Sequence, residues 1–434
     1  MSNDSALPWR LVWSLSATQI VSWGTAYYAF GVLLSPMHTE FGGSQVALTG
    51  AYSLALGISA TLLVPVGAWI DRRGGRAVMT GGSLLAVVLF GLLGLNHSLT
   101  GFYLIWCAMG FVMATTLYEA AFAVIEIEFE DSYRKGITVL TFAGGFASTV
   151  FIPVTQWLID GFGWRGAAYG LALANLLVCV PLHARLPARK TAHRVPHSPI
   201  DPGGGRGDDA PPVAPIDPGG GGADGAPPVA VSRPPRRDAA RMGARQAIRH
   251  ALRSLRFWTL VVAYTAYALV VGTMGVHLIP LLGAKGFSTG EVVLIASLVG
   301  PMQVAGRLAQ FGFGDALDVR RLSRIVFGLL PIAMAILLLA PAQSLFIAFF
   351  IVFYGVGMGI QTILRGTAMP ALFGRDNYAA LSNLLSAPGV AARAVAPFLA
   401  SLIVVGLGGY PGLEWAMLAV ALIALIAIWV ATRR

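Results

Sequence analysis

Two arginines and one glutamate stand inside long apolar stretches of this chain. Arg393 lies in GVAARAVAPF and Arg307 in VAGRLAQ. Each guanidinium could hold a carboxylate through two parallel hydrogen bonds, a geometry that lysine does not offer. Glu119 lies in LYEAAF, and a carboxyl group held away from water can take up and release a proton. These residue types indicate recognition of an anion, with a group suited to proton coupling.

Other polar side chains in the apolar stretches extend this candidate site. Gln303 lies one helical turn before Arg307 and shares its face, where it could bond to a ligand or hold the arginine. His277, in GVHLIP, could titrate or bind a ligand, or be a hydrogen-bonded packing residue. Three tyrosines are expected to line the same cavity: Tyr27, Tyr28 and Tyr118.

A charge at the middle of a bilayer costs about 2.5–3.5 kcal/mol on insertion scales. Arg307, Arg393 and Glu119 must therefore each face a cavity or a partner. A fixed ion pair inside the helix bundle is the alternative to a ligand site for all three.

Composition predicts the elements that position these residues. The chain has 434 residues, of which 56% are hydrophobic and 12% charged, against about 25% charged in soluble domains. Apolar stretches of about 20 residues recur, and each is long enough to cross a bilayer as a helix. We expect an all-α membrane protein with twelve transmembrane helices in two six-helix bundles. The expected spans are 11–35, 46–70, 76–95, 101–125, 136–160, 166–185, 257–282, 291–313, 322–340, 344–366, 378–405 and 411–431.

The distribution of basic residues predicts the orientation. The first apolar stretch is preceded by no cleavage-site pattern, so we interpret it as a membrane helix and not as a signal peptide. With the N-terminus in the cytoplasm, only Arg165 and Lys285 of the 30 Lys and Arg fall in loops on the other side, and Arg307, Arg365 and Arg393 fall within or at the end of spans. This asymmetry follows the positive-inside rule. The net charge of +10 therefore reflects topology in an inner or plasma membrane, and nucleic acid is not an expected partner.

A linker divides the chain. Residues 1–185 should form the N-terminal bundle and 256–434 the C-terminal bundle. Between them, 186–255 is rich in Pro and Gly, should be disordered, and contains a direct repeat at 199–214 and 215–230. Its basic end, 241–258, is expected to be an interfacial helix. Two halves of six spans are typical of transporters with a midplane site between the halves.

The loop after the second span carries a recognisable pattern. Gly67, Asp71, Arg72, Gly74 and Arg76 stand between the second and third spans. This pattern resembles the signature loop of the major facilitator superfamily, with one additional glycine before the last arginine. The resemblance implies alternating access: two bundles rock around a central site. In that architecture the loop is a cytoplasmic gate, in which the Asp71 carboxylate closes against the start of the eleventh span when the carrier is open outward.

Further stretches resemble one branch of that superfamily, the monocarboxylate and oxalate–formate type carriers. Oxalate–formate carriers place a basic residue in the eighth and eleventh spans, where Arg307 and Arg393 stand here. Arg134-Lys135 before Gly144-Gly145 is a further similarity. Monocarboxylate carriers often have an aspartate where this chain has Gln303. The resemblance implies a small organic anion, most simply a monocarboxylate, moved with a proton or in exchange for a counter-anion.

No motif supports an enzyme. The sequence has no Walker or dinucleotide fingerprint, no nucleophile elbow and no His/Cys metal spacing, so we expect no cofactor, no metal and no catalytic residues. Two alternatives to an anion carrier remain. One is an efflux carrier for hydrophobic or cationic compounds, although the Gly-Pro-x-x-Gly-Gly pattern of such exporters matches the fifth span poorly. The other is a non-transporting receptor or scaffold that uses the linker.

Overall fold

The computed structural model describes residues 9–41, 44–128, 133–187, 249, 252–313, 318–341, 345–373 and 378–433. In this part of the chain the regular elements are helices. They are α1 Trp9–Trp23, the π-helical turn η1 Gly24–Tyr28, α2 Ala29–Phe41, α3 Gln45–Arg73, α4 Gly75–Leu95, α5 Leu99–Thr116, α6 Tyr118–Glu128, α7 Tyr133–Gly144, α8 Ala147–Ala174, the π-helical turn η2 Asn175–Cys179, α9 Val180–Ala184, α11 Leu255–Ala284, α12 Thr289–Phe313, α13 Val319–Leu339, α14 Ile347–Phe373, α15 Tyr378–Gly406 and α16 Tyr410–Ala431.

These helices confirm the predicted fold class. Ten helical stretches in the described residues are long and apolar enough to cross a membrane. One of them, Lys135–Ala184, contains two passes, because its backbone reverses at Gly163 with φ 70°. The first pass is the continuous helical run α1–η1–α2, which is longer at both ends than the predicted span 11–35. The described helices thus group into twelve passes, with bounds close to those predicted.

Short turns join the passes. Gly74 has φ 80° and ends α3, donating its N–H to the Ile70 carbonyl at 2.7 Å, and α4 begins at the next residue. A residue with a side chain is strained at such a φ. At the other end of the passes, the Ser44 and Ser98 hydroxyls accept hydrogen bonds from the N–H groups of Ala47 and Gly101, and so cap α3 and α5.

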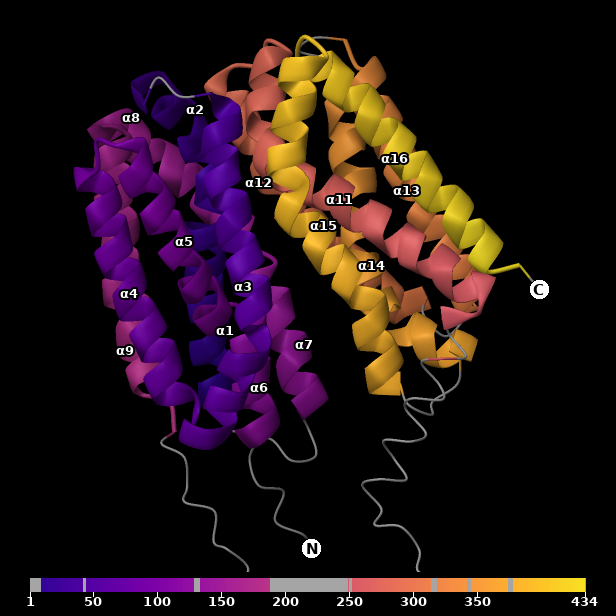
Figure 1. Cartoon of the computed structure of the whole chain (residues 1–434), viewed down its shortest axis with the longest axis horizontal. Helices are drawn as coiled ribbons and strands as arrows, with labels where there is room; N and C mark the ends of the chain where they lie inside the picture. Colours follow the sequence, from indigo (N-terminus) through magenta and orange to yellow (C-terminus); the bar gives the residue numbers. More distant parts are fainter. Residues whose placement is uncertain are drawn as a thin grey trace, which may run out of the picture.

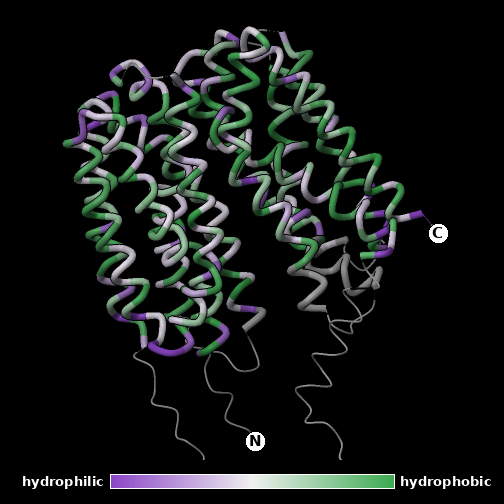
Figure 2. The backbone as a smooth tube through the Cα atoms, in the orientation of Figure 1, coloured by the Kyte–Doolittle hydropathy of each residue, from purple (hydrophilic) through white to green (hydrophobic). Residues whose placement is uncertain are grey.

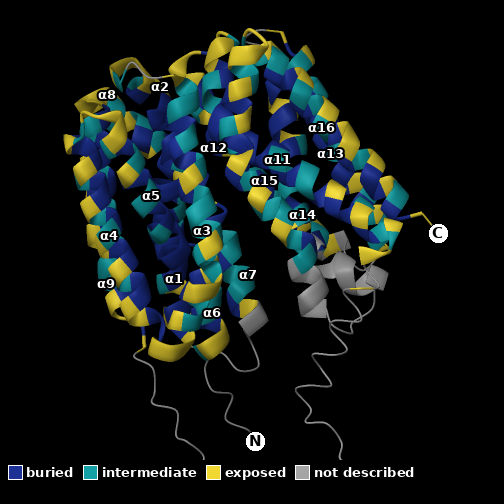
Figure 3. Cartoon of the chain, viewed as in Figure 1, coloured by how far each residue is buried: buried dark blue, intermediate teal, exposed yellow. Residues whose placement is uncertain are grey.

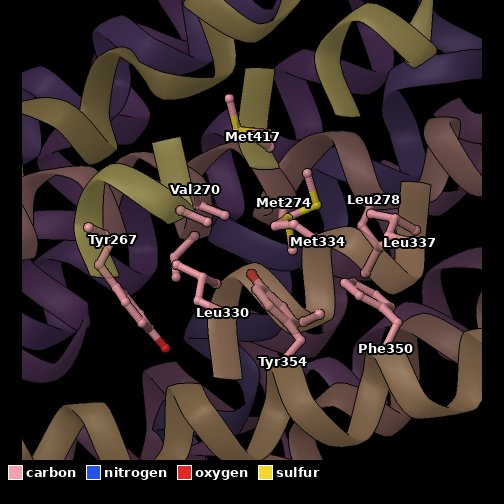
Figure 4. Packing of buried hydrophobic residues seen from close by; sticks show 14 of the residues in the cluster. Tyr267, Val270, Met274, Leu278, Leu330, Met334, Leu337, Phe350, Tyr354 and Met417 are labelled. Atoms are coloured by element: carbon pink, nitrogen blue, oxygen red, sulfur yellow. The ribbon is translucent and has the colours of Figure 1, made fainter. Parts of the chain in front are cut away.

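The helices form two groups, α1–α9 and α11–α16, which stand side by side in Figure 1. The buried apolar residues divide in the same way. Two clusters lie almost entirely within residues 11–186, and a third lies almost entirely within 257–431. Figure 4 shows part of the third cluster, in which Met274, Leu330 and Phe350 pack between neighbouring helices.

The outer faces are apolar while the ends are polar. Figure 3 shows buried residues inside each group and exposed ones around it, and Figure 2 shows that residues along the helices are largely hydrophobic while hydrophilic ones gather toward the ends. Val64 and Leu345, for example, are 82% and 91% exposed. Exposed apolar side chains over the length of the helices are expected where the surrounding solvent is lipid.

The two groups touch mainly toward one end. We call the end at Trp9, Leu186 and Leu255 the terminal end, and the opposite end the far end. In Figure 1 the groups approach at the far end and diverge toward the terminal end. Four hydrogen bonds cross between them on the far side: Gln45 Nε2 to Tyr410 Oη at 2.9 Å, Thr49 Oγ1 to Ser401 Oγ at 2.8 Å, Phe398 N to Ser53 Oγ at 3.2 Å and Thr149 Oγ1 to Ser297 O at 2.9 Å.

Several predictions fall outside the described residues. The linker repeat at 199–230 lies there, as does most of the predicted interfacial helix 241–258, in which Arg249 and Leu252 are described as helical. The side chain of Arg365 is not described either. The predicted division into domains at 185 and 256 therefore stays a prediction.

Candidate ligand site between the two helix groups

A cavity of about 160 Å³ lies between the two helix groups. Its walls come from α1, η1, α3, α5 and α6 on one side and from α11, α14 and α15 on the other. Glu119 of the first group and Arg393 of the second both line it. It is thus the place where the two halves present opposite charges to one internal space.

Arg393 reaches this cavity from the middle of α15. Glycine at 272 allows α15 to pass close to α11, because a β-carbon there would lie 3.0 Å from the Arg393 carbonyl oxygen. The guanidinium lies near the hydroxyls of Tyr27 and Tyr267 and interacts with them electrostatically. Within the described residues it forms no ion pair and donates no hydrogen bond. A cation in this position is available to a ligand.

Glu119 lies where the fourth pass breaks. Leu117 takes an extended conformation with ψ −170°, so α5 ends at Thr116 and Glu119 falls in the first turn of α6. The break frees the Thr116 carbonyl, which accepts a buried hydrogen bond of 2.8 Å from Gln19 Nε2. The Glu119 side chain is exposed to the cavity, and in the described part of the chain it forms no salt bridge.

An aromatic wall stands beside the two charges. The π-helical turn η1 carries Tyr27 and Tyr28, whose ring centroids lie 5.2 Å apart. Trp23 packs against Tyr27 at 5.1 Å and against Tyr118 at 4.9 Å. Of these four residues, Trp23 and Tyr27 line the cavity. A π-helical turn changes which side chains share a helix face, and such turns are frequent at functional sites.

Arg307 lies outside this cavity. It is 6% exposed, donates a hydrogen bond to the Thr141 carbonyl, and interacts electrostatically with the hydroxyls of Tyr28 and Tyr118. Gln303 lies close to the Tyr28 hydroxyl. Neither Arg307 nor Gln303 is among the residues that line the cavity. The two arginines predicted to act together therefore do not share the cavity, and Arg307 already has a protein partner.

His277 lies nearer the far end. Its side chain is completely buried, and Nε2 is 3.0 Å from the Pro397 carbonyl oxygen and 3.3 Å from Ser401 Oγ. Ser401 is also the partner of Thr49 across the interface of the two groups. His277 does not line the cavity, so its contacts are those of a residue that holds α11 to α15.

The predicted gate loop lies at the terminal end. Asp71 and Arg72 are exposed, and Arg76 Nε donates to the Leu186 carbonyl, so it caps the end of the sixth pass. Asp71 forms no salt bridge within the described residues. The expected partner of Asp71 is the start of the eleventh span near Asn377; Asn377 is outside the described residues, and the latch stays a prediction.

The sequence interpretation missed several cavity residues. Tyr264 and Tyr267 line the wall formed by α11, and Ser59, Gln361 and Ser386 supply the other polar side chains. Their polarity inside membrane spans was the available signal. No three His, Cys, Asp or Glu side chains in the described regions gather in a way that could hold a metal ion.

Comparison with known families decides what this fold is. The family model described as Major Facilitator Superfamily matches residues 15–364. The chain belongs to the major facilitator superfamily. It is accordingly a multi-pass integral membrane protein, and a transporter rather than an enzyme. A comparison with curated protein sequences gives no significant match.

Solved structures of other major facilitator proteins share the fold at low sequence identity. A mutant of the nucleoside transporter NupG superimposes with TM-score 0.72 at 12% identity, covering 98% of this chain and 99% of that one. A bacterial homologue of the human lysosomal transporter Spinster, in an inward-facing and occupied conformation, superimposes with TM-score 0.66 at 14% identity. The match covers 99% of this chain and 98% of that one. A structure described under substrate recognition in proton-dependent oligopeptide transporters superimposes with TM-score 0.64 at 12% identity. The match covers 97% of this chain and 98% of that one.

Proposed function

We propose that this protein is a secondary transporter of a small organic monoanion, a monocarboxylate in the simplest case. The observation that carries the proposal is Arg393, an unpartnered guanidinium that lines the cavity between the two halves. A guanidinium that lines a cavity can select a carboxylate through two charge-assisted hydrogen bonds. The same positive charge disfavours cationic cargo, and so speaks against an exporter of cationic compounds.

The arrangement of the halves supports alternating access. The positive-inside distribution of Lys and Arg favours a cytoplasmic terminal end. With that orientation the conformation would be the inward-open state, since the halves meet at the far end and diverge toward the terminal end. Closing the terminal end and separating the far end would expose the same cavity to the other side of the membrane.

Glu119 is the proposed proton-coupling group. It shares the cavity with Arg393 without an ion pair between them in the described residues. A substrate carboxylate beside Arg393 would bring a second negative charge near the Glu119 carboxylate. Like charges in one site favour proton uptake by one of them, so binding of the anion and binding of a proton would support each other. Exchange for a counter-anion is the other mode of coupling.

Transport by purified protein in liposomes tests this proposal. With an inward-directed pH gradient or a preloaded counter-anion, we expect saturable uptake of at least one radiolabelled monocarboxylate from a broad panel. Cationic dyes and nucleosides, offered in the same vesicles, should not accumulate. Absence of saturable uptake for every carboxylate under both gradients would overturn the proposed function.

The gate makes a separate prediction. Asp71→Asn should slow turnover with little change in the affinity for substrate, because the carboxylate is proposed to stabilise only the state closed at the terminal end. Turnover is measured as the rate of counterflow, and affinity as competition in the same assay. Asp318→Asn, which removes another exposed carboxylate at that end, is the matched control. An unchanged rate in Asp71→Asn would count against the latch.

A further inference from the structure

The polar end of a cavity ligand would lie at Arg393 and Tyr267. Both residues line the cavity, and they interact electrostatically. The Tyr267 side chain is 2% exposed and its hydroxyl has no hydrogen-bond partner in the described structure. The Tyr267 ring is at the edge of the packed cluster in Figure 4. A buried hydroxyl without a partner costs free energy, and a carboxylate accepting from both Arg393 and Tyr267 would remove that cost.

The α3 side of the cavity is mainly apolar. Leu56, Ala60 and Leu63 of α3 line it together with Met113 and Leu117, and Ser59 is the polar residue of α3 in this wall. The ring of Trp23 also faces this space. The part of the ligand that contacts these apolar side chains should itself be apolar. A polar group there would lose its hydrogen bonds to water without gaining hydrogen bonds to the protein.

The cavity has room for a body as large as an aromatic ring. Its volume is about 160 Å³, and an apolar cavity of about 150 Å³ is known to hold a benzene molecule. A two- or three-carbon acid would leave part of the space without contacts, and so lose dispersion energy with the wall. Aromatic side chains along the cavity, among them Trp23, Tyr27 and Tyr264, offer edge and face contacts to a flat ring.

The charges of the cavity restrict the ligand to one carboxylate. Arg307 does not line the cavity and donates a hydrogen bond to the Thr141 carbonyl. A second carboxylate on the ligand would meet the apolar wall, neutral polar side chains such as Ser59 and Gln361, or the Glu119 carboxylate. None of these carries a positive charge that would compensate a buried negative one.

We propose that the preferred substrate is a ring-bearing monocarboxylate of about the size of benzoate or phenylacetate, with its carboxylate between Arg393 and Tyr267 and its ring against the α3 wall. This inference rests on the proposed function, since it assigns the class of substrate to the same cavity.

Competition in the liposome assay tests it. Benzoate and phenylacetate should inhibit uptake of a labelled monocarboxylate at concentrations about tenfold or more below those needed for acetate and lactate, since one methylene-sized group in an apolar pocket changes discrimination by about tenfold or more. Terephthalate, which adds a second carboxylate to the ring, and benzyl alcohol, which has none, should compete poorly.

Variants of the cavity wall separate recognition of the ring from folding. Gly389 lines the cavity, and a methyl group added there would lie 3.6 Å from Ala268 Cβ, an ordinary contact. Gly389→Ala and Ala60→Leu should each lower the ratio of benzoate to acetate uptake about tenfold, because both narrow the space for a ring. Gly91→Ala, where the added methyl meets nothing within 4 Å on α4, is the matched control and should leave the ratio unchanged.

The outcomes are distinguishable. Transport of acetate or lactate with equal or better affinity than benzoate, or an unchanged ratio in both wall variants, would overturn the substrate assignment while the proposed function stands. Transport of no carboxylate at all would overturn both.

Discussion

Arg393→Ala is expected to abolish saturable uptake while the protein still inserts and folds. In the described residues the guanidinium lines the cavity without an ion pair or hydrogen bond, so its removal breaks no such bond within the protein. A hydrogen bond to a charged group contributes about 1.5–3 kcal/mol, which corresponds to roughly a 10- to 150-fold loss in kcat/KM for each such bond. Arg393→Ala would lose two such bonds. Arg393→Lys should retain a weakened activity, because lysine keeps the positive charge but lacks the two parallel N–H donors of the guanidinium.

The measurement is initial uptake into liposomes, normalised to reconstituted protein whose elution profile and melting temperature match those of the unsubstituted chain. Arg253→Ala is the control, because Arg253 is exposed at the terminal end and outside the cavity. Full uptake by Arg393→Ala would remove this residue from the site. A protein that fails to fold would instead indicate the structural role that the sequence left open.

Glu119→Gln should abolish uptake driven by a pH gradient while leaving exchange of substrate intact. The substitution keeps the shape of the side chain in the first turn of α6 but removes the group that exchanges a proton. We expect exchange of labelled for unlabelled substrate to continue, since the halves can still move around a bound anion. Accumulation driven by a pH gradient should be lost, because proton movement would no longer be linked to that of the anion.

Counterflow and gradient-driven uptake, measured in one preparation, decide this prediction. Glu126→Gln is the matched control, since Glu126 is an exposed residue of the same helix that does not line the cavity. Gradient-driven accumulation that persists in Glu119→Gln would exclude this residue as the coupling group. Loss of counterflow as well would indicate that Glu119 contacts the substrate.

The twelve passes could be predicted because each is a local property of the sequence. A run of about 20 apolar residues requires a helix in lipid whatever its neighbours are, and the Ser44 cap and the Gly74 turn lie where the apolar runs stop. The family resemblance rested on the loop from Gly67 to Arg76, whose residues lie together in the chain.

The composition of the site was less predictable because it depends on backbone irregularities. No sequence pattern indicated the π-helical turn that carries Tyr27 and Tyr28, or the break at Leu117 that places Glu119 in a helix N-terminus. The partner of Arg307 depends on the distance between α7 and α12, which belong to different halves. A charged residue in a span signals a site, but its neighbours across the bundle are a tertiary property.

The character of the far-side contact has a thermodynamic consequence. The four hydrogen bonds that cross between the halves on the far side join neutral groups. The two salt bridges found in the described residues do not cross between the halves: Arg165–Glu40 lies within the first half and Lys285–Glu414 within the second. A neutral hydrogen bond contributes about 0.5–1.5 kcal/mol net, and water can replace each of them when the halves separate. The far-side contact therefore adds only a few kcal/mol to the free-energy difference between the two orientations, a range in which the binding of one small molecule changes which orientation is populated. An interface locked by buried ion pairs would have held the protein in one state.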